Sequence, residues 1–398
     1  MRVLYLNPFS QEVSGPDESL RTLLGALVPR GLDAHVVLPT PGPQVPRYEE
    51  LGAHVHFAPL ALLRRDLSVD AALYPARLAG AAFAVGAIAR RVGADLVHTN
   101  MEVLLEGGLA ARALGLPHVL HYRGNTLDRP RPIFDALTAI WTRTADQIFC
   151  ISGATAEVFR RRGYNRGIEV LYNPVDLVRF APGPAASEVR AALGAAPGQP
   201  LVGTVGRLHP RKDLETFVRA AARVASDSPT ARFVVVGAAE APVETAYRDR
   251  MVALVRELGL EGRLSFAGAR RDMPEVMRAL DVFVLTSRHE GFGRVVAEAM
   301  GAARPVVVTD EGAPPELVGR GRFGLCAPAG DPAAFAAAVT GLLRDPERAA
   351  ALGAAAAAAA HQFDVALVAD RVWNRYRELV DARRAGVKRT AAPTARAP

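Results

Sequence analysis

The chain is poor in cysteine and in lysine. Of its 398 residues only two are cysteines, Cys150 and Cys326, and they lie far apart in apolar segments. This excludes a disulfide framework and a Cys-x-x-Cys site. Only two of the 48 basic residues are lysines, Lys212 and Lys388. Arginine is a planar fork and lysine a compact point charge, so the single lysine outside the C-terminal tail marks its segment for attention.

No apolar run is long enough to cross a bilayer. The two longest weakly polar stretches, 78–89 and 349–360, fall short of the roughly 20 residues that a membrane-spanning helix needs. The N-terminus enters an apolar strand directly, without the charged segment, long apolar core and small-residue cleavage site of a signal peptide. We therefore expect a cytoplasmic protein.

Signatures of metal and nucleic-acid binding are missing as well. No Asp-x-Asp sequence occurs, so the usual carboxylate cradle for a metal–diphosphate complex is absent. His54 and His56 share one face of an expected strand, but no third ligand accompanies them. The basic clusters contain no interleaved aromatic residues and match no nucleic-acid-binding motif. We expect no metal, no other cofactor and no nucleic-acid partner.

The composition is that of a globular chain with an excess of positive charge. Half of the residues are hydrophobic, 22% are charged, and the formal net charge is +7. This charge suits an anionic partner such as a nucleotide, a lipid phosphate or a membrane surface. The clusters Arg64-Arg65 and 160–162 read most simply as solvated helix faces, yet they also suit anionic lipid headgroups. A peripheral contact with the inner face of the membrane is therefore included among the expected partners.

Short apolar strands alternate with helical segments along most of the chain. This predicts an α/β fold with parallel sheets covered by helices, and the length predicts two domains. A stretch rich in Pro, Gly and Ala interrupts the alternation between residues 180 and 200. The strands are expected at 2–7, 35–38, 55–57, 96–98, 118–121 and 147–151, and then at 201–205, 232–236, 264–266, 282–285 and 305–308.

We expect two Rossmann-like domains of similar length whose sheets face each other across a cleft. Ligands of open parallel sheets bind at the carboxyl ends of the strands. A final helix is expected to return to the first domain, before a disordered tail. The expected bounds of these four parts are 1–178, 179–364, 365–384 and 385–398.

The segment 282–300, VFVLTSRHEGFGRVVAEAM, is the most informative one. A buried strand is followed by a loop with Glu290, and the glycines after it let backbone approach a ligand closely. Free N–H groups at the start of the next helix favour a phosphate. Glu298, inside that helix, is placed to accept two ribose hydroxyls, and Glu290 to accept sugar hydroxyls. Two surface glutamates beside a helix start are the alternative.

The segment LVGTVGRLHPRKD brings Arg207 and Lys212 to the carboxyl end of another strand. Cleaving a sugar–diphosphate bond loads negative charge onto the leaving oxygens, and a preorganised pair of cations stabilises that charge. A solvated basic loop is the alternative for this spacing. The glycines at 203 and 206 do not form the dinucleotide fingerprint.

Two residues of the first half are further candidates. His121, in VLHYR, ends the expected strand 118–121 and would reach a transferred sugar if it faced the cleft, although a histidine satisfied at a strand end fits equally well. Gly15 follows the first strand and offers a backbone amide to a diphosphate. Pro16, next to it, has no N–H to donate.

In these motifs the chain resembles the retaining GT-B glycosyltransferases of the glycosyl transferase group 1 family (family 4). The resemblance covers most of the chain and is strongest over 201–325. EGFGRVVAEAM, with Glu290 and Glu298, is similar to the family signature, and GRLHPRKD to its donor-phosphate segment. Weaker similarities lie in DQIFCISGATAEVF, VLYNPVD and EGAPPELV.

The resemblance implies a metal-independent enzyme that moves a hexose-type sugar from a nucleotide-diphosphate donor to an acceptor hydroxyl with retention. The acceptor would be a glycan, a lipid-linked or a small molecule, in polysaccharide, glycolipid or glycoconjugate synthesis. It further implies that Arg207 and Lys212 grip the diphosphate, that His121 and Glu290 contact the sugar and Glu298 the ribose. Backbone amides at Phe292, Gly293 and Arg294 would hold phosphate.

Two other functions fit the same architecture. A sugar-nucleotide epimerase would need carboxylates for proton transfer at the sugar ring and would use no acceptor. A non-catalytic sugar-binding subunit would lack one of Arg207, Lys212 or Glu290, and all three are present.

Overall fold

The computed structural model describes residues 1–11, 14–63, 69–124 and 131–386. Arg64, Arg65 and nearly all of the predicted tail lie outside these ranges. The chain divides into two compact units: the first comprises Met1–Pro174 and Val365–Pro398, the second Val175–Asp364. The first unit thus ends four residues before the predicted boundary at 178, and the C-terminal helix belongs to it.

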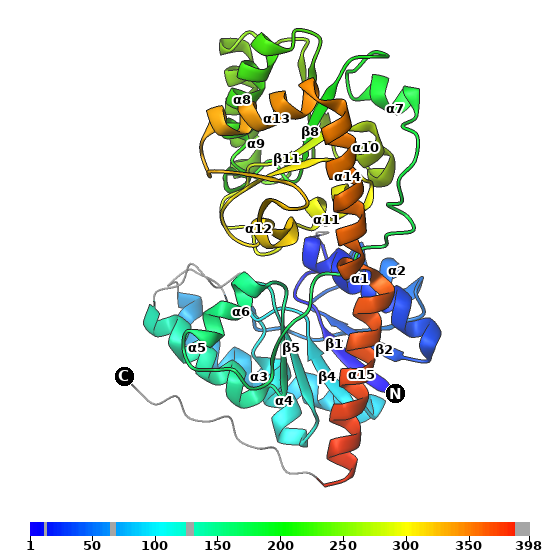
Figure 1. Ribbon diagram of the computed structural model, residues 1–398. Coiled ribbons are helices and arrows are strands. Elements are labelled where there is room, and N and C mark those ends of the chain that lie inside the picture. The colour runs from blue at the N-terminus through cyan, green and yellow to red at the C-terminus, as the bar shows by residue number, and fades with distance from the viewer. Residues whose placement is uncertain (12–13, 64–68, 125–130, 387–398) are drawn as a thin grey trace. The chain divides into compact units, whose positions relative to one another are not determined.

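The first unit is built around a parallel sheet of seven strands in the order β3-β2-β1-β4-β5-β6-β7 (Figure 1). The order reverses direction between β1 and β4, so the carboxyl ends of these two strands flank the topological switch point, where ligands bind in open α/β sheets. The strands are β1 Arg2–Leu6, β2 Asp33–Leu38, β3 His54–Phe57, β4 Leu96–Thr99, β5 His118–Tyr122, β6 Gln147–Cys150 and β7 Ile168–Val170.

Helices cover both faces of this sheet because alternate side chains of each strand point to opposite sides. In β1, Val3 and Tyr5 join a core with α1 and α15, whereas Leu4 and Leu6 join a core with α3 and α4. The helices are α1 Gly15–Leu27, α2 Gln44–Glu49, α3 Val69–Val92, α4 Glu106–Leu114, α5 Arg131–Thr144, α6 Gly153–Arg160 and α15 Val365–Arg384, with a 3-10 turn at Val28–Arg30.

The second unit has a six-stranded parallel sheet in the order β10-β9-β8-β11-β12-β13, with its switch point between β8 and β11. These strands are nearly continuous apolar runs, as expected for a sheet buried on both faces. The strands are β8 Leu201–Val205, β9 Arg232–Val236, β10 Leu264–Gly268, β11 Val282–Leu285, β12 Val306–Thr309 and β13 Leu325–Ala327.

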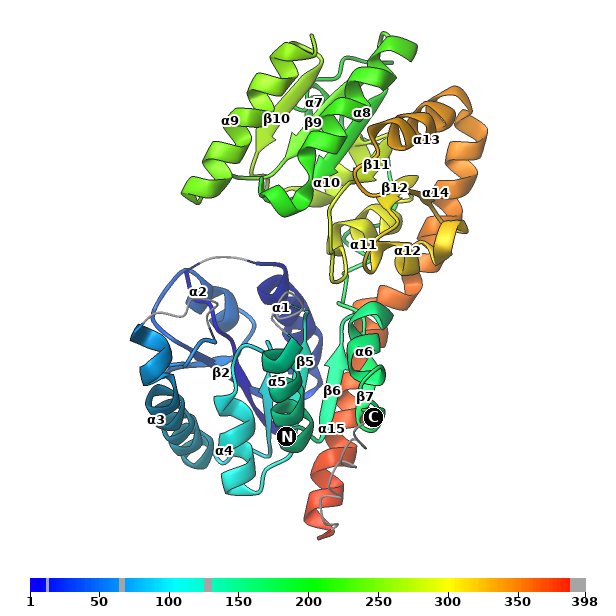
Figure 2. The ribbon, with the colours of Figure 1, turned by 90° about the vertical axis from the view of Figure 1, so that its left-hand side faces the viewer.

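Helices cover both faces of the second sheet (Figure 2). Phe217 of α8 and Phe335 of α13 pack in one core with Val202 and Val284 of the sheet. The helices are α7 Ser187–Ala192, α8 Leu214–Asp227, α9 Pro242–Glu257, α10 Met273–Ala279, α11 Arg294–Gly301, α12 Pro314–Leu317, α13 Pro332–Arg344 and α14 Pro346–Ala360, with 3-10 turns at Pro210–Lys212, Gly319–Gly321 and His361–Phe363.

The α/β prediction with two parallel sheets is confirmed. All eleven predicted strands occur; three have the predicted bounds, and each end of the others lies within two residues of its predicted position. Two strands, β7 and β13, were not predicted. Each is an edge strand of three residues, which is too short for a period-2 pattern to stand out.

Candidate active site

Lys212 lies at the carboxyl end of β8, beside the switch point of the second sheet. After Val205 the chain turns through Gly206 and the 3-10 helix Pro210–Lys212 before α8 begins. Gly206 has a φ of +153°, and a Cβ there would stand 3.5 Å from Cε of Lys212. The glycine therefore adopts a conformation unfavourable for other residues and lets the lysine side chain lie across the strand end.

Glu290 lies in the loop between β11 and α11, on the other side of the switch point. The Ala313 amide donates to the Glu290 carbonyl oxygen at 3.0 Å. Gly312 has a φ of +73°, and a Cβ there would stand only 2.5 Å from the same oxygen. The turn before α12 thus supports the loop through a close backbone contact that only glycine allows.

Four interactions join the β8–α8 turn to the β11–α11 loop. The Lys212 ammonium donates to Oε2 of Glu290 at 2.6 Å. Three further bonds run beside it: the Thr286 hydroxyl donates to the Lys212 carbonyl at 3.0 Å, the Arg288 amide to the Arg211 carbonyl at 2.9 Å, and Nε of Arg288 to Oδ2 of Asp213 at 2.9 Å. Two segments nearly eighty residues apart in sequence therefore act as one structural unit.

The ion pair favours the ionised form of Glu290. Burial raises the pKa of Glu290, but the charge and hydrogen bond of Lys212, the Ser287 hydroxyl and the charge of Arg211 together lower it by more. The pKa therefore lies below the ordinary glutamate value. The side chains of Lys212 and Glu290 are 28% and 20% exposed. An ionised carboxylate accepts hydrogen bonds from hydroxyls, and an ammonium donates to phosphate oxygens. The site offers both functions side by side.

Arg207 pairs with a residue that the sequence analysis missed. Its Nη1 lies 3.6 Å from Oε1 of Glu244, and the arginine side chain is 58% exposed whereas the glutamate is 3% exposed. The other oxygen of Glu244 accepts the amides of Glu240 at 3.0 Å and Ala241 at 3.4 Å, which fixes the carboxylate at the start of α9. Its position three residues after Ala241, the N-cap of α9, was the available signal.

The remaining predicted donor residues surround the first turn of α11. Gly293 is its N-cap with a φ of +84°. Arg294 donates through Nε to Oε1 of Glu298 at 2.8 Å, and both side chains are largely buried. Phe292 packs edge-on against Phe363, so its ring belongs to the core and only its backbone is suited to a ligand.

His121 lies at the carboxyl end of β5, but its ring is only 2% exposed. It stacks on His98, whose Nδ1 bonds to the Tyr376 hydroxyl of α15, and both ring nitrogens of His121 are buried without a hydrogen-bond partner. Burial and the charge of Arg123 hold the pKa of His121 well below its usual value, so the ring is neutral. The predicted sugar contact would require a more open position than this one.

Polar side chains that sequence reasoning overlooked connect the strand ends of the first sheet. Asn100, after β4, donates to Oδ1 of Asn7, after β1, at 2.9 Å. The buried guanidinium of Arg123 donates to the carbonyl and side-chain oxygens of Asn100 at 2.8 and 2.6 Å, and to Oδ1 of Asn173 at 2.8 Å. The sequence feature that could have indicated these residues is a polar residue placed shortly after each apolar strand.

Gly15 is the first residue of α1, where backbone N–H groups have no intrahelical acceptor. A Cβ at Gly15 would meet no atom within 4 Å. Asp17 holds this helix start, because its carboxylate accepts the Ser14 amide at 2.8 Å and the Asn7 side-chain amide at 2.7 Å. Gly15 therefore lies next to the polar residues of the β1–β4 switch point.

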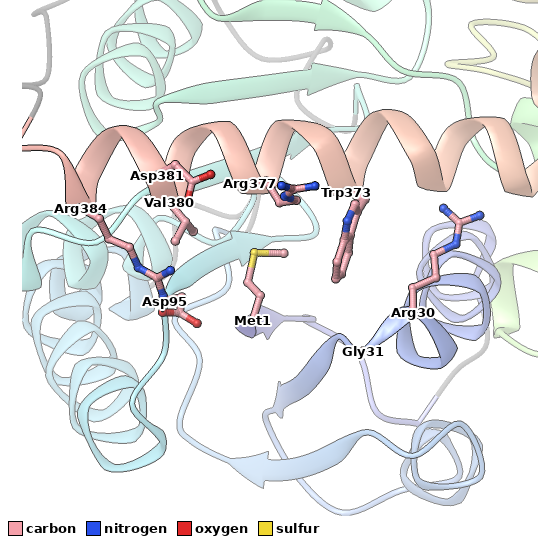
Figure 3. A pocket seen from close by; sticks show the side chains of 9 residues that line it. All are labelled: Met1, Arg30, Gly31, Asp95, Trp373, Arg377, Val380, Asp381 and Arg384. Atoms are coloured by element: carbon pink, nitrogen blue, oxygen red, sulfur yellow. Dashed lines mark hydrogen bonds and ion pairs between the residues drawn. The ribbon is translucent and has the colours of Figure 1, made fainter.

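A pocket of about 360 Å³ in the first unit lies apart from these residues. Figure 3 shows Trp373, Arg377 and Arg384 of α15 lining it together with Met1 and Arg30. Met1 precedes β1, so the pocket lies at the amino ends of the strands, opposite the switch-point edge. It does not belong to the candidate site.

The other features singled out in the sequence have structural partners. Arg162 donates to Asp135 at 2.5 Å and lies over the ring of Phe134, and Arg161 bonds to Glu157 at 3.2 Å. Within the described ranges there is no group of three or more His, Cys, Asp or Glu side chains that could hold a metal ion. Likewise, no helix in those ranges is both long and apolar enough to cross a membrane.

Comparison with known proteins assigns both halves of the chain to glycosyltransferase families. Residues 186–359 match the model of the "Glycosyl transferases group 1" family, and residues 13–179 match "Glycosyltransferase Family 4". The chain is 32% identical to the 2-deoxystreptamine N-acetyl-D-glucosaminyltransferase of Streptomyces fradiae over 87% of this chain and 90% of that one. It is 31% identical to a GDP-mannose-dependent alpha-mannosyltransferase of Mycobacterium tuberculosis over 81% and 82%.

Solved structures agree with this assignment. HepE of Anabaena in complex with UDP-glucose matches with a TM-score of 0.81 and 26% identity, over 95% of this chain and all of that one. Sucrose-phosphate synthase from Thermosynechococcus elongatus shares the fold, with a TM-score of 0.77 and 22% identity over 96% and 99%. The chain therefore belongs to the group 1 glycosyltransferases and is a glycosyltransferase of the GT-B type.

Proposed function

We propose that this glycosyltransferase moves a hexose-type sugar from a nucleotide-diphosphate donor to an acceptor hydroxyl, with retention and without a metal ion. The observation that carries the proposal is the 2.6 Å contact between Lys212 and Glu290 at the switch point of the second sheet. The contact places a residue suited to bind phosphate, Lys212, next to one suited to bind sugar hydroxyls, Glu290. The HepE structures with UDP and with UDP-glucose support a donor of this class.

Arg207 and Lys212 stabilise the leaving diphosphate in this proposal. Both follow β8, and charge develops on the diphosphate oxygens as the glycosidic bond to the donor breaks. Two fixed cations supply the electrostatic stabilisation for which many phosphate-handling sites use a metal ion. Their anionic partners, Glu244 and Glu290, hold them in position before the donor binds.

Glu290 and Glu298 bind the hydroxyl groups of the donor. Glu290 is ionised and lies beside Lys212, so it accepts hydrogen bonds from the sugar while the lysine binds the adjacent phosphate. Glu298 lies in α11 and accepts hydrogen bonds from the ribose hydroxyls of the nucleotide. The backbone amides of Phe292, Gly293 and Arg294 lie at the N-terminus of α11 and bind the diphosphate.

The acceptor hydroxyl attacks the anomeric carbon on the face from which the diphosphate leaves. The new C–O bond forms as the bond to the diphosphate breaks, and a diphosphate oxygen takes the hydroxyl proton. The transition state resembles an oxocarbenium ion. This step needs no protein nucleophile, and the neutral, buried His121 transfers no proton in it.

The acceptor is assigned to the first unit, at the edge where Asn100 and Arg123 lie, and the Gly15 amide at the same edge is assigned to the diphosphate. A glycan, a glycolipid or a small polyhydroxylated molecule would suit its hydrogen-bonding groups. Among the similar enzymes, one is named for 2-deoxystreptamine and another for lipopolysaccharide core synthesis.

A donor panel tests the proposal directly. Thermal shift with nucleoside diphosphates and their hexose conjugates, with and without EDTA, should show a donor that stabilises the fold equally well in both conditions. Transfer to a panel of acceptors should release the nucleoside diphosphate, and the NMR coupling of the product should show the anomeric configuration of the donor. An inverted product, or a loss of activity in EDTA that added metal restores, would contradict it. Isomerisation of the donor without an acceptor would indicate an epimerase.

A further inference from the structure

The outer face of α3 is an apolar surface in contact with solvent. On its inner side, Ala81, Val85 and Ile88 pack into the core of the first unit with β1 and β4. On its outer side, Phe83 is 76% exposed and Leu73 is 56% exposed. Phe83 is the most exposed aromatic side chain of the described residues. Nothing in its own unit covers it.

The exposed apolar residues form one stripe along the helix. At about 100° per residue, Leu73, Phe83 and Ala87 fall within an arc of roughly 80°. Ala76 and Gly80 are exposed within the same arc. The stripe is therefore a continuous ridge, about four turns long, rather than a set of scattered surface residues.

The borders of this ridge are basic. Arg77 lies along one side, and Arg90 and Arg91 lie at the C-terminal end, all three exposed. The segment 73–92 contains no aspartate or glutamate. The one acidic residue of α3 is Asp70, near its N-terminus. A helix with three arginines and one aspartate differs from an ordinary solvated face, where both signs of charge alternate.

We propose that the outer face of α3 binds the surface of an anionic lipid bilayer. Phenylalanine and leucine enter the headgroup–acyl boundary, and the flanking arginines attract lipid phosphates. Only two large apolar side chains are available, which is too few for the well-packed core of a stable protein interface. The same two residues suffice for a reversible membrane contact when cations flank them.

The arginines at 160–162 suit this role less well. Arg161 and Arg162 pair with Glu157 and with Asp135 of α5. The apolar residues exposed on α5, Ile133 and Ile140, are 44% and 37% exposed, less than Leu73 and Phe83 of α3. The contact with an anionic surface is therefore assigned to α3.

Co-sedimentation of the full chain with lipid vesicles tests this assignment. Vesicles of phosphatidylglycerol mixed with phosphatidylcholine should bind the protein, whereas phosphatidylcholine alone should bind it far more weakly. Added salt should weaken binding because the attraction is partly electrostatic. The double variant L73E/F83E should bind roughly tenfold more weakly or worse, since it removes the apolar insertion and adds like charge.

Val178→Glu is the matched control, because Val178 is 86% exposed in the second unit. It should bind vesicles like the wild type. All variants should melt at the same temperature and transfer sugar to a soluble acceptor at the same rate, since only exposed side chains change. Binding that is absent, indifferent to anionic lipid, or unchanged in L73E/F83E would overturn the proposal. A dimer in solution that L73E/F83E converts to a monomer would instead assign this face to a second copy and also overturn it.

Discussion

At the scale of single residues, the site depends on charged groups that hold one another in place. Lys212 and Glu290 are partly buried and 2.6 Å apart, and Arg207 rests against the buried carboxylate of Glu244. A group that is already oriented loses little freedom when a ligand binds or when charge develops. The proposed catalytic power therefore lies in the pairs rather than in any side chain alone.

Lys212→Ala should lower kcat by about 10²–10³, the loss found when a preorganised donor to a developing charge is deleted. The rate of nucleoside diphosphate release at saturating donor and acceptor measures it. Arg219→Ala, which removes an exposed cation of α8 paired with Glu215 at 2.9 Å, is the control and should leave kcat unchanged. Turnover near the wild-type rate in the lysine variant would remove Lys212 from the mechanism.

Glu244→Gln should lower kcat about tenfold with little change in the donor KM, because the amide oxygen still caps α9 but no longer orients Arg207 by its charge. The change should disappear in an Arg207→Gln background if Glu244 acts through that arginine. Glu240→Gln removes the same charge from an exposed neighbour and should have no effect. A full effect of E244Q in the double variant would mean that Glu244 acts elsewhere.

The Lys212–Glu290 pair should also make stability depend on pH. Because the folded-state pKa of Glu290 is lowered, its contribution is complete above the ordinary glutamate pKa and is lost as the pH falls through the lower value. Denaturant titrations should therefore show Glu290→Gln to be less stable than the wild type near neutrality, with the difference shrinking in acid. A difference that stays constant from neutral to acidic pH would speak against the pair.

Sequence could indicate these residues only in part. Lys212 stood out because lysine is rare in this chain, and Glu290 because a strand and a glycine-rich loop precede a helix. Glu244 and Arg123 carried only weaker signals, a helix-capping position and a place directly after a strand, and each gains its role from a partner that only the fold brings near. His121 was placed on the correct strand end, but the side of the sheet to which its ring points depends on packing against α15.

At the scale of elements, the two loops around the switch point work as one unit. The strand order places the ends of β8 and β11 side by side, and the cross-links between the loops set their register. The strands themselves could be predicted from the sequence, because each is a short apolar run between turns. The loop contacts were not, because they rest on backbone proximity at glycines such as Gly312.

Gly312→Ala should impair both activity and stability, because a Cβ there would stand 2.5 Å from the Glu290 carbonyl oxygen. Gly262→Ala is the matched control: its φ of +71° is close to the +73° of Gly312, but a Cβ would meet nothing within 4 Å. In both variants alanine must adopt a positive φ, which lowers the free energy of unfolding by an amount of the order of 1 kcal/mol. Only G312A should also lower kcat/KM, and equal kinetics for the two would show that the contact has no part in shaping the loop.

At the scale of the whole molecule, the chain enters the second unit after Pro174 and returns at Val365. The returning helix α15 completes the core of the first unit with Val368, Val372 and Tyr376. The first unit therefore cannot reach its native core until the far end of the chain has docked.

Tyr376→Ala should destabilise the first unit by about 3–5 kcal/mol, the cost of removing a large buried ring. Hydrogen exchange followed by mass spectrometry should show faster exchange in β1, β4 and α1, while β8 and β11 keep their protection. Arg377→Ala, an exposed neighbour on the same helix, should change neither. Uniform loss of protection in both units would mean that they unfold as one.

Calorimetric titration of ligand pairs tests the central claim most directly, using the nucleoside diphosphate and the nucleotide sugar that the donor panel identifies. If Lys212 holds phosphate and Glu290 holds sugar, K212Q should weaken binding of both ligands. E290Q should weaken binding of the nucleotide sugar more than binding of the diphosphate, because it removes the sugar contact as well as the charge that holds Lys212 in position. Equal losses for both ligands in E290Q, or unaltered diphosphate binding in K212Q, would contradict the account.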